Sequence, residues 1–233
     1  NAGIFWEAGA FGTFLCMAYF LYLVKKIPKK ISDLFDKNSL VLFLAILTTT
    51  STTTYLAFSL ILITFSFNLG GFYKIFMVLL FIPVMYISFN KIPFLKEKIN
   101  YQLETSDESA NRFGSLLLDW EDIKKRPLTG WSRKTEILFQ DDIESSHRPN
   151  GISNLIRSYG FIYFIIYMYL IFYSLKNITS FYSLNKNYAL IGLFLILILA
   201  FSQLIFDKVF FRGFVFLSIT YGFYKKNNYL YAQ

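Results

Sequence analysis

Long runs without a charged residue constrain this chain more than any other feature of its sequence. The longest covers residues 38–73, which is 36 residues without Asp, Glu, Lys or Arg. A helix that crosses a bilayer needs about 20 mainly apolar residues, and its backbone polar groups must be satisfied within the membrane. The runs therefore predict an all-α, multi-pass transmembrane helical bundle. The other runs are 8–24, 75–90, 158–175 and 188–206, together with 209–224, which contains Arg212.

The composition excludes several other classes of protein. Hydrophobic residues make up 55% of the chain and charged residues only 16%, against about 25% charged in soluble domains. Disorder needs low hydrophobicity, and a disulfide-stapled mini-protein needs more than the single Cys16. Because the first residue is Asn1 rather than Met, we expect a fragment or a processed chain.

The 36-residue run is too long for one straight span. At 1.5 Å per residue it would extend about 54 Å, whereas the hydrocarbon core is about 30 Å thick. Residues 48–54 are all Ser or Thr, and their side chains compete with helical hydrogen bonds. We therefore predict a turn there between two short helices, near 39–50 and 54–69, and about seven spans in the chain. The alternative is one long kinked helix.

The distribution of lysine supports the split. Short cytoplasmic loops of membrane proteins carry an excess of Lys and Arg. Seven spans place ten lysines on one side and only Lys208 and Arg212 in the short loops of the other. A single span over 38–73 would instead place seven basic residues in the short loops of one side and five in those of the other, which gives no orientation. The lysine-rich side and the C-terminus are therefore predicted to be cytoplasmic. The ten are Lys25, Lys26, Lys29, Lys30, Lys37, Lys74, Lys176, Lys186, Lys225 and Lys226.

This topology divides the chain into three segments. Residues 1–90 form a first transmembrane block of about four spans, and residues 158–233 form a second block of about three spans with a cytoplasmic C-terminus. Residues 91–157 form one large, partly helical periplasmic loop with eleven basic and eleven acidic residues. The net charge of +8 equals that of the ten lysines with Asp33 and Asp36. It is an orientation signal, so no nucleic-acid partner is expected.

The loop contains a predicted amphipathic helix. Thr105 to Glu108 fits a capping box, and apolar residues follow at helical spacing until Pro127 ends the pattern. Such a helix can lie at the membrane interface with Trp120 as its anchor, or it can pack on the transmembrane bundle. The apolar stripe consists of Phe113, Leu116, Leu117, Trp120 and Ile123.

Three segments resemble those of a known family. Residues 3–11, GIFWEAGAF, resemble the GxFWExGAF segment of bacterial O-antigen polymerases and ligases. Residues 123–130 resemble their I-x-x-x-P-L-x-G element, and Asn150, Leu155 and Gly160 resemble their N-x-x-x-x-L-x-x-x-x-G entry into the helix after the periplasmic loop. The order of the segments and the place of the loop match as well. Members of this family are longer than this chain.

The resemblance implies a membrane glycosyltransferase of the bacterial inner membrane. It implies transfer of glycan from an undecaprenyl-pyrophosphate carrier at the periplasmic face, without a cofactor, alongside a chain-length regulator and other polysaccharide-assembly proteins. Ligases carry His directly before the Asn of the third segment, where this chain has Pro149. We therefore expect an O-antigen polymerase. The alternatives are a ligase that transfers glycan to the lipid A core, and a polytopic transporter or flippase.

A pyrophosphate leaving group needs cations around it, and the arginine fork binds its oxygens bidentately. Arg112 lies on the predicted amphipathic helix, and Arg148 and Arg157 bracket the entry to the helix after the loop. Asn150, which belongs to the third resembling segment, completes the predicted substrate-binding set. The alternative for each arginine is an ion pair with an acid of the same loop.

His147 and Glu7 are the candidate catalytic residues. His147 is the only histidine, and its side chain is the one that titrates near neutrality, although an exposed loop histidine is the simpler interpretation. Glu7 is an isolated acid at the mouth of the first run, where an acid is typical of function; its alternative is an ion pair with Arg212 or Arg157. The acidic groups 119–122 and 141–144 have no spacing that fixes a metal geometry, so no metal is expected.

Overall fold

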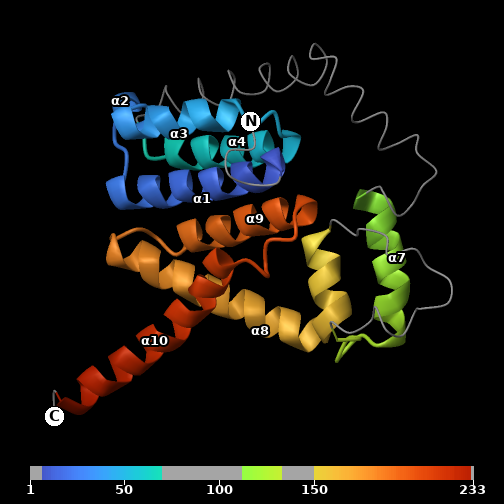
Figure 1. Ribbon diagram of the computed structural model, residues 1–233. Coiled ribbons are helices and arrows are strands. Elements are labelled where there is room, and N and C mark those ends of the chain that lie inside the picture. The colour runs from blue at the N-terminus through green and yellow to red at the C-terminus, as the bar shows by residue number, and fades with distance from the viewer. Residues whose placement is uncertain (1–6, 70–111, 133–149, 232–233) are drawn as a thin grey trace. The chain divides into compact units, whose positions relative to one another are not determined.

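The computed structural model of the protein describes residues 7–69, 112–132 and 150–231. All regular structure in these residues is helical, which confirms the predicted all-α class (Figure 1). The chain divides into two compact units, Asn1–Ser106 and Asp107–Gln233, and each is described by itself. The described helices are α1 (Ala8–Lys26), α2 (Ile31–Leu34), α3 (Lys37–Leu47), α4 (Thr52–Ser66), α7 (Arg112–Lys125), α8 (Gly151–Phe181), α9 (Asn187–Ser202) and α10 (Val209–Tyr231).

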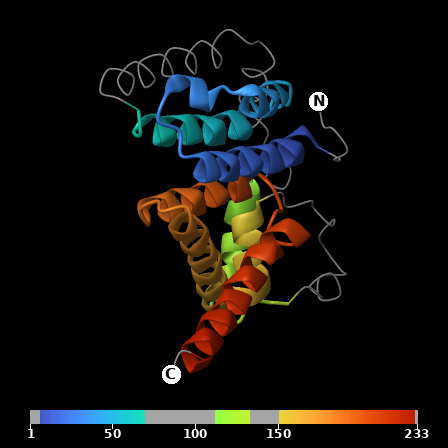
Figure 2. The same cartoon turned by 90° about the vertical axis from the view of Figure 1, so that its left-hand side faces the viewer.

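In the first unit, α3 and α4 form an antiparallel hairpin that packs on α1 (Figure 2). Helix α3 ends at Leu47, and the hydroxyl groups of Thr48 and Thr49 donate to the carbonyls of Ala45 and Ile46, both at 2.8 Å. Thr50 then takes a positive φ of 50° and reverses the chain before α4 begins. The predicted split of the 36-residue run is confirmed, and the alternative of one long kinked helix is wrong.

Aromatic side chains fill the space between these helices. The ring of Tyr19 lies 5.3 Å from that of Phe58, and the ring of Phe20 lies 6.0 Å from that of Phe65, measured between centroids. All four side chains are buried. Offset and edge-on aromatic pairs of this kind are stabilising beyond the area that they bury, so the high aromatic content of the chain is structural in this unit.

In the second unit, α8 is the central element and contacts α7, α9 and α10. Its backbone leaves the helical region at Gly160, where φ is 80° and ψ is 171°. The first part of α8, which is yellow in Figure 1, therefore runs in a different direction from the rest, and α7 lies beside it. The rest of α8 buries Ile171 and Leu175, and α9 buries Leu195 and Leu199.

Two described helices, α1 and α8, are long and apolar enough to cross a membrane by length and composition. The prediction of about seven spans is therefore wrong for the part of the chain that the structure describes. The remaining apolar helices are shorter, and α3 has only 11 residues, which is about 17 Å of helix against a core of about 30 Å. The charge-free runs at 38–73 and 188–206 overestimate helix length because they include residues that form turns. The predicted span at 75–90 lies outside the described residues.

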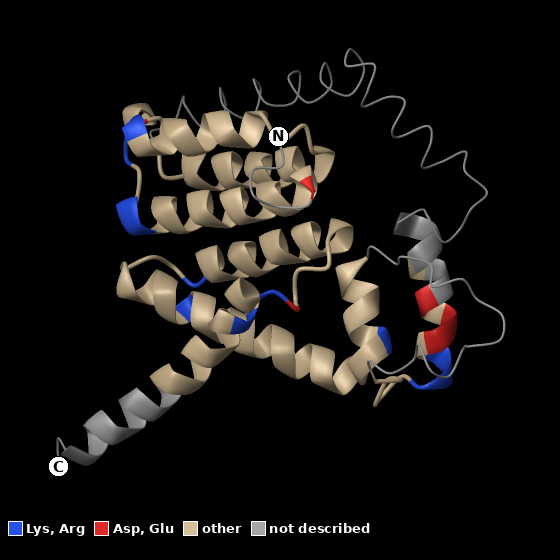
Figure 3. Ribbon diagram, viewed as in Figure 1, with Lys and Arg blue, Asp and Glu red and all other residues tan. Residues whose placement is uncertain are grey.

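Charged residues of α1 lie in its last turn and α9 has none, whereas α8 carries Arg157 and Lys176 within it and α7 carries several (Figure 3). Lys25 and Lys26 occupy the last turn of α1, and Lys124 and Lys125 occupy the last turn of α7. Cations at a helix C-terminus interact favourably with the helix dipole. Among the described residues, Asp119 of α7 is the one charged residue that is buried.

Candidate functional site

Helix α8 begins at a capping asparagine. The side-chain Oδ1 of Asn150 accepts hydrogen bonds from the backbone N–H groups of Ile152 at 3.0 Å and Ser153 at 3.2 Å. An asparagine at this position satisfies N–H groups that have no partner within the helix. The residue is fully buried, and its Nδ2 has no hydrogen-bond partner in the described part of the chain. Asn150 therefore fixes where α8 starts.

A buried carboxylate joins α7 to the first turns of α8. Asp119 of α7 has no exposed surface, and it accepts a hydrogen bond of 2.5 Å from the Ser153 hydroxyl. The Arg157 guanidinium lies 3.4 Å from Asp119 and 4.0 Å from Asp122. Burying a charge is strongly unfavourable unless it is paired and hydrogen-bonded. The acid–arginine cluster of Asp119, Asp122, Ser153 and Arg157 therefore fixes the register between the two helices.

A loop after α7 fits into the break of α8. Three backbone hydrogen bonds connect them: Trp131 N–H donates to Arg157 O at 2.9 Å, Ser132 N–H to Ser158 O at 2.8 Å, and Phe161 N–H to Pro127 O at 2.8 Å. The break at residue 160 leaves backbone groups without helical partners, and a buried backbone group must be paired. The loop supplies those partners, so the break and the loop depend on each other.

Two glycines permit this close approach. Gly130 has a φ of 67°, and a Cβ there would lie 2.6 Å from the Ser158 carbonyl oxygen. A Cβ at Gly160 would lie 2.0 Å from the carbonyl oxygen of Leu128. Both positions combine a positive φ with neighbouring backbone so close that a Cβ would clash with it, which only glycine tolerates. We call residues 127–132 together with Gly160 the backbone latch.

Trp131 closes the latch from the side of α7. Its indole Nε1–H donates to the Asp122 carbonyl at 2.8 Å. The Arg126 guanidinium carbon lies 4.5 Å from the centre of the Trp131 ring, a distance at which a cation is attracted to the ring face. The Pro-Leu-Thr-Gly-Trp sequence at 127–131 is typical of a turn. The structure confirms a turn there, and its hydrogen bonds tie it to both helices.

The other face of the α8 start lines a small hollow. Asp207 there pairs with Arg212 at 3.3 Å, and Tyr159 begins a series of neighbouring rings on α8 that continues through Tyr163 and Tyr167. The hydroxyl of Tyr167 donates to the Phe206 carbonyl at 3.0 Å. Amide, hydroxyl and carboxylate groups beside an aromatic ring can bind a sugar. The lining consists of Gly151, Asn154, Leu155, Ser158, Tyr159, Leu204, Phe206 and Asp207.

The structure brings together two of the predicted substrate-binding residues. Asn150 and Arg157 both lie in the first turns of α8, and Arg112 is the first residue of α7, which packs on α8. His147 and Arg148 lie outside the described residues. Glu7 lies in the first unit, exposed, directly before α1. Arg157 forms ion pairs with Asp119 and Asp122, as the alternative interpretation of this arginine predicted.

The sequence predicts Asn150 and Arg157 as site residues, but it does not single out Asp119, Asp122 and Ser153, which hold Arg157 in place. Ser153 and Arg157 are four residues apart, and Asp119 and Asp122 are three apart, so each pair occupies one helix face. That spacing was the available signal. The sequence offers every acid of the loop as an alternative partner for each arginine, without indicating that Asp119 and Asp122 are the partners of Arg157. In the described parts of the chain, no group of three or more potential ligands is placed to hold a metal ion.

Comparison with known proteins gives no match. No protein-family model, no curated protein and no solved structure is significantly similar to this chain.

Proposed function

We propose that this chain is part of a glycosyltransferase of the bacterial inner membrane that polymerises undecaprenyl-pyrophosphate-linked repeat units at the periplasmic face. One observation carries the proposal. Two of the segments that resemble the O-antigen polymerase and ligase family, at 123–130 and 150–160, interlock through the backbone latch. Segments that are separated by about 20 residues in sequence thus build one structure at the start of α8.

The reaction joins two lipid-linked glycans. The bond between the anomeric carbon of the donor and the pyrophosphate breaks, a hydroxyl oxygen of the acceptor bonds to that carbon, and the hydroxyl proton passes to a base. In this proposal Arg112, Arg148 and Arg157 bind the pyrophosphate, Asn150 fixes the start of the helix that carries Arg157, and His147 assists the hydroxyl. The chain needs no cofactor for these steps.

The contacts of Arg157 refine its proposed role. Its guanidinium is 18% exposed and is oriented by two carboxylates. A preorganised cation stabilises developing charge more effectively than a mobile one. The hollow on the other face of the α8 start, which Asn154, Tyr159 and Asp207 help to line, is of a kind that could take a sugar ring of the same substrate.

Polysaccharide analysis of a bacterial strain tests the proposal. Deletion of the full-length gene is expected to leave single repeat units on the cell surface, because attachment still occurs without polymerisation. Persistence of long-chain polysaccharide would end the proposal. Accumulation of carrier-linked polymer would instead identify a ligase. Complementation with Arg112→Ala and Arg148→Ala variants should shorten the polymer, and unchanged length in both would remove the phosphate-binding role.

A further inference from the structure

A cluster of lysines at the end of α1 has no role in the proposed transfer reaction. Lys25, Lys29 and Lys30 are exposed, and Lys26 is half-buried. Lys25 and Lys26 occupy the last turn of α1, one of the two membrane-length helices, and Lys29 and Lys30 follow directly after it. Clusters of basic residues beside a membrane-spanning helix attract anionic lipid headgroups.

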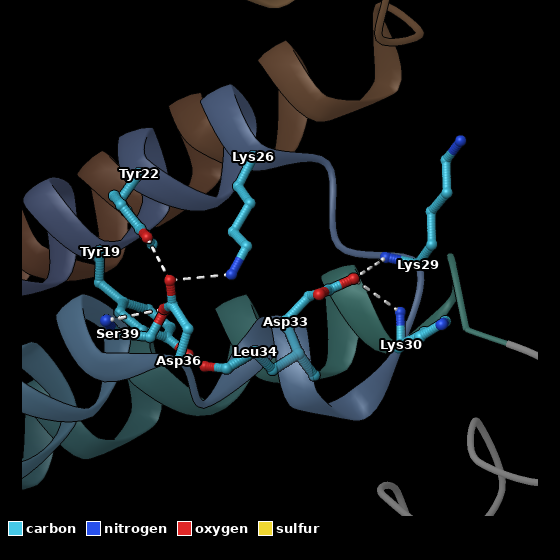
Figure 4. A network of polar contacts seen from close by, with 9 residues as sticks. All are labelled: Tyr19, Tyr22, Lys26, Lys29, Lys30, Asp33, Leu34, Asp36 and Ser39. Atoms are coloured by element: carbon cyan, nitrogen blue, oxygen red, sulfur yellow. Dashed lines mark hydrogen bonds and ion pairs between the residues drawn. The ribbon is translucent and has the colours of Figure 1, made fainter.

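The loop that carries these lysines is fastened to α1. Tyr19 donates its hydroxyl to the Leu34 carbonyl at 2.9 Å, and Tyr22 donates to the Asp36 carboxylate at 2.6 Å (Figure 4). Lys26 pairs with the same carboxylate at 2.9 Å. Residues 27–36 are therefore held against the helix at three points.

The two acids of the loop are engaged by these and other bonds. Asp33 accepts hydrogen bonds from the backbone N–H groups of both Lys29 and Lys30, each at 3.0 Å. Asp36 also caps α3 by accepting from the Ser39 N–H at 3.0 Å. Neither carboxylate pairs with the ammonium groups of Lys29 or Lys30, whose side chains extend away from Asp33 in Figure 4.

The backbone before these lysines takes an unusual conformation. Ile27 has a φ of 51°, which is rare for a β-branched residue and persists only where surrounding contacts hold it. Its N–H donates to Leu23 O at 2.9 Å, and Pro28 follows as a buried residue. The chain thus turns sharply at the end of α1 and presents the next two lysines.

We propose that Lys25, Lys29 and Lys30 form a preorganised binding site for the phosphate of an anionic phospholipid in the leaflet beside the end of α1. The proposal rests on α1 crossing the membrane. The occupant follows from charge and position, because three ammonium groups that have no carboxylate partner among the described residues adjoin the apolar helix. Asp33 orders the backbone at Lys29 and Lys30 by accepting hydrogen bonds from their N–H groups, although its negative charge repels a phosphate.

Native mass spectrometry tests the site on the full chain, purified in neutral detergent and titrated with phosphatidylglycerol or phosphatidylcholine. We expect tighter binding of phosphatidylglycerol, and a loss of about tenfold or more for Lys29→Gln/Lys30→Gln. The matched control is Lys176→Gln/Lys186→Gln, which also removes two exposed lysines and should weaken binding less than about threefold. Equal losses in both variants, or none, would overturn the proposal.

Asp33 distinguishes an ordered site from general attraction. Asp33→Ala removes a negative charge, so general attraction predicts tighter binding of phosphatidylglycerol. An ordered site predicts weaker binding, by about threefold or more, and recovery in Asp33→Asn, which keeps an acceptor oxygen. Tighter binding by Asp33→Ala would overturn the proposal, as would displacement of the phospholipid by millimolar glycerol phosphate, which would indicate a site for soluble phosphate.

Discussion

The two units each contain an acid–base pair, and the pairs differ in burial. In the first unit, Lys26 and Asp36 are 27% and 30% exposed. In the second unit, Arg157 is 18% exposed and Asp119 is fully buried. An exposed pair contributes about 0–1 kcal/mol, whereas removal of one partner from a buried pair costs about 3–5 kcal/mol. The same chemistry therefore orders a surface loop in one unit and locks two helices together in the other.

The largest expected effect is that of Arg157→Met. The substitution keeps a long side chain but leaves the Asp119 carboxylate buried without its cation, so the free energy of unfolding should fall by about 3–5 kcal/mol. Thermal unfolding in detergent measures this. The double variant Asp119→Asn/Arg157→Met should recover much of the loss because no charge is then buried.

Arg212→Met is the matched control for the buried arginine. Arg212 pairs with Asp207 through side chains that are both 47% exposed, so its loss should cost no more than about 1 kcal/mol. Equal destabilisation by the two arginine variants would show that burial does not distinguish the pairs.

Gly160→Ala should have the next largest effect. A methyl group there meets the Leu128 carbonyl oxygen and must accept a φ of 80°, which together cost about 3 kcal/mol. Gly213→Ala is the control, because nothing lies within 4 Å of a Cβ at that position of α10. The control should be neutral or stabilising by up to about 1 kcal/mol. Similar unfolding temperatures for the two variants would contradict the role of the backbone latch.

The sequence predicted the local features that depend on local chemistry. The hydroxyl run at 48–54 predicted the reversal between α3 and α4, because Thr side chains bond their own backbone. The Pro-Leu-Thr-Gly segment predicted a turn, and Asn150 marked the start of α8. Each of these signals concerns residues within one or two turns of each other.

Features that depend on distant residues could not be predicted in the same way. Gly160 lies in a run that is apolar and helical on both sides, and its break is stabilised by a loop about 30 residues earlier. Which of eleven loop acids pairs with Arg157 is a tertiary choice among similar side chains. The predicted number of spans was wrong because the length of a charge-free run does not show where a helix ends.

Asp36→Ala should destabilise the protein less than Arg157→Met or Gly160→Ala. The substitution removes the cap of α3 and the acceptor for Tyr22, and loss of an N-cap costs about 1 kcal/mol. Lys26→Met, which removes only the exposed ion pair, should cost about 0.5 kcal/mol or less. Thermal unfolding of both variants separates the cap from the pair. A larger loss for Lys26→Met would show that the ion pair, and not the cap, holds the loop.

The smallest expected effect is the dependence of the first unit on acid. The Tyr22 hydroxyl, Lys26 and Ser39 hold the pKa of Asp36 well below its ordinary value, and the N–H groups of Lys29 and Lys30 lower the pKa of Asp33. A carboxyl with a lowered folded-state pKa stabilises the fold above its ordinary pKa, and this stability is lost as the pH falls through the folded-state value. Unfolding temperatures should therefore decline from about pH 5 downward. The decline should be shallower in Asp36→Asn, which has no carboxylate to protonate at that position. An equally steep decline in the variant would assign the acid sensitivity to groups other than Asp36.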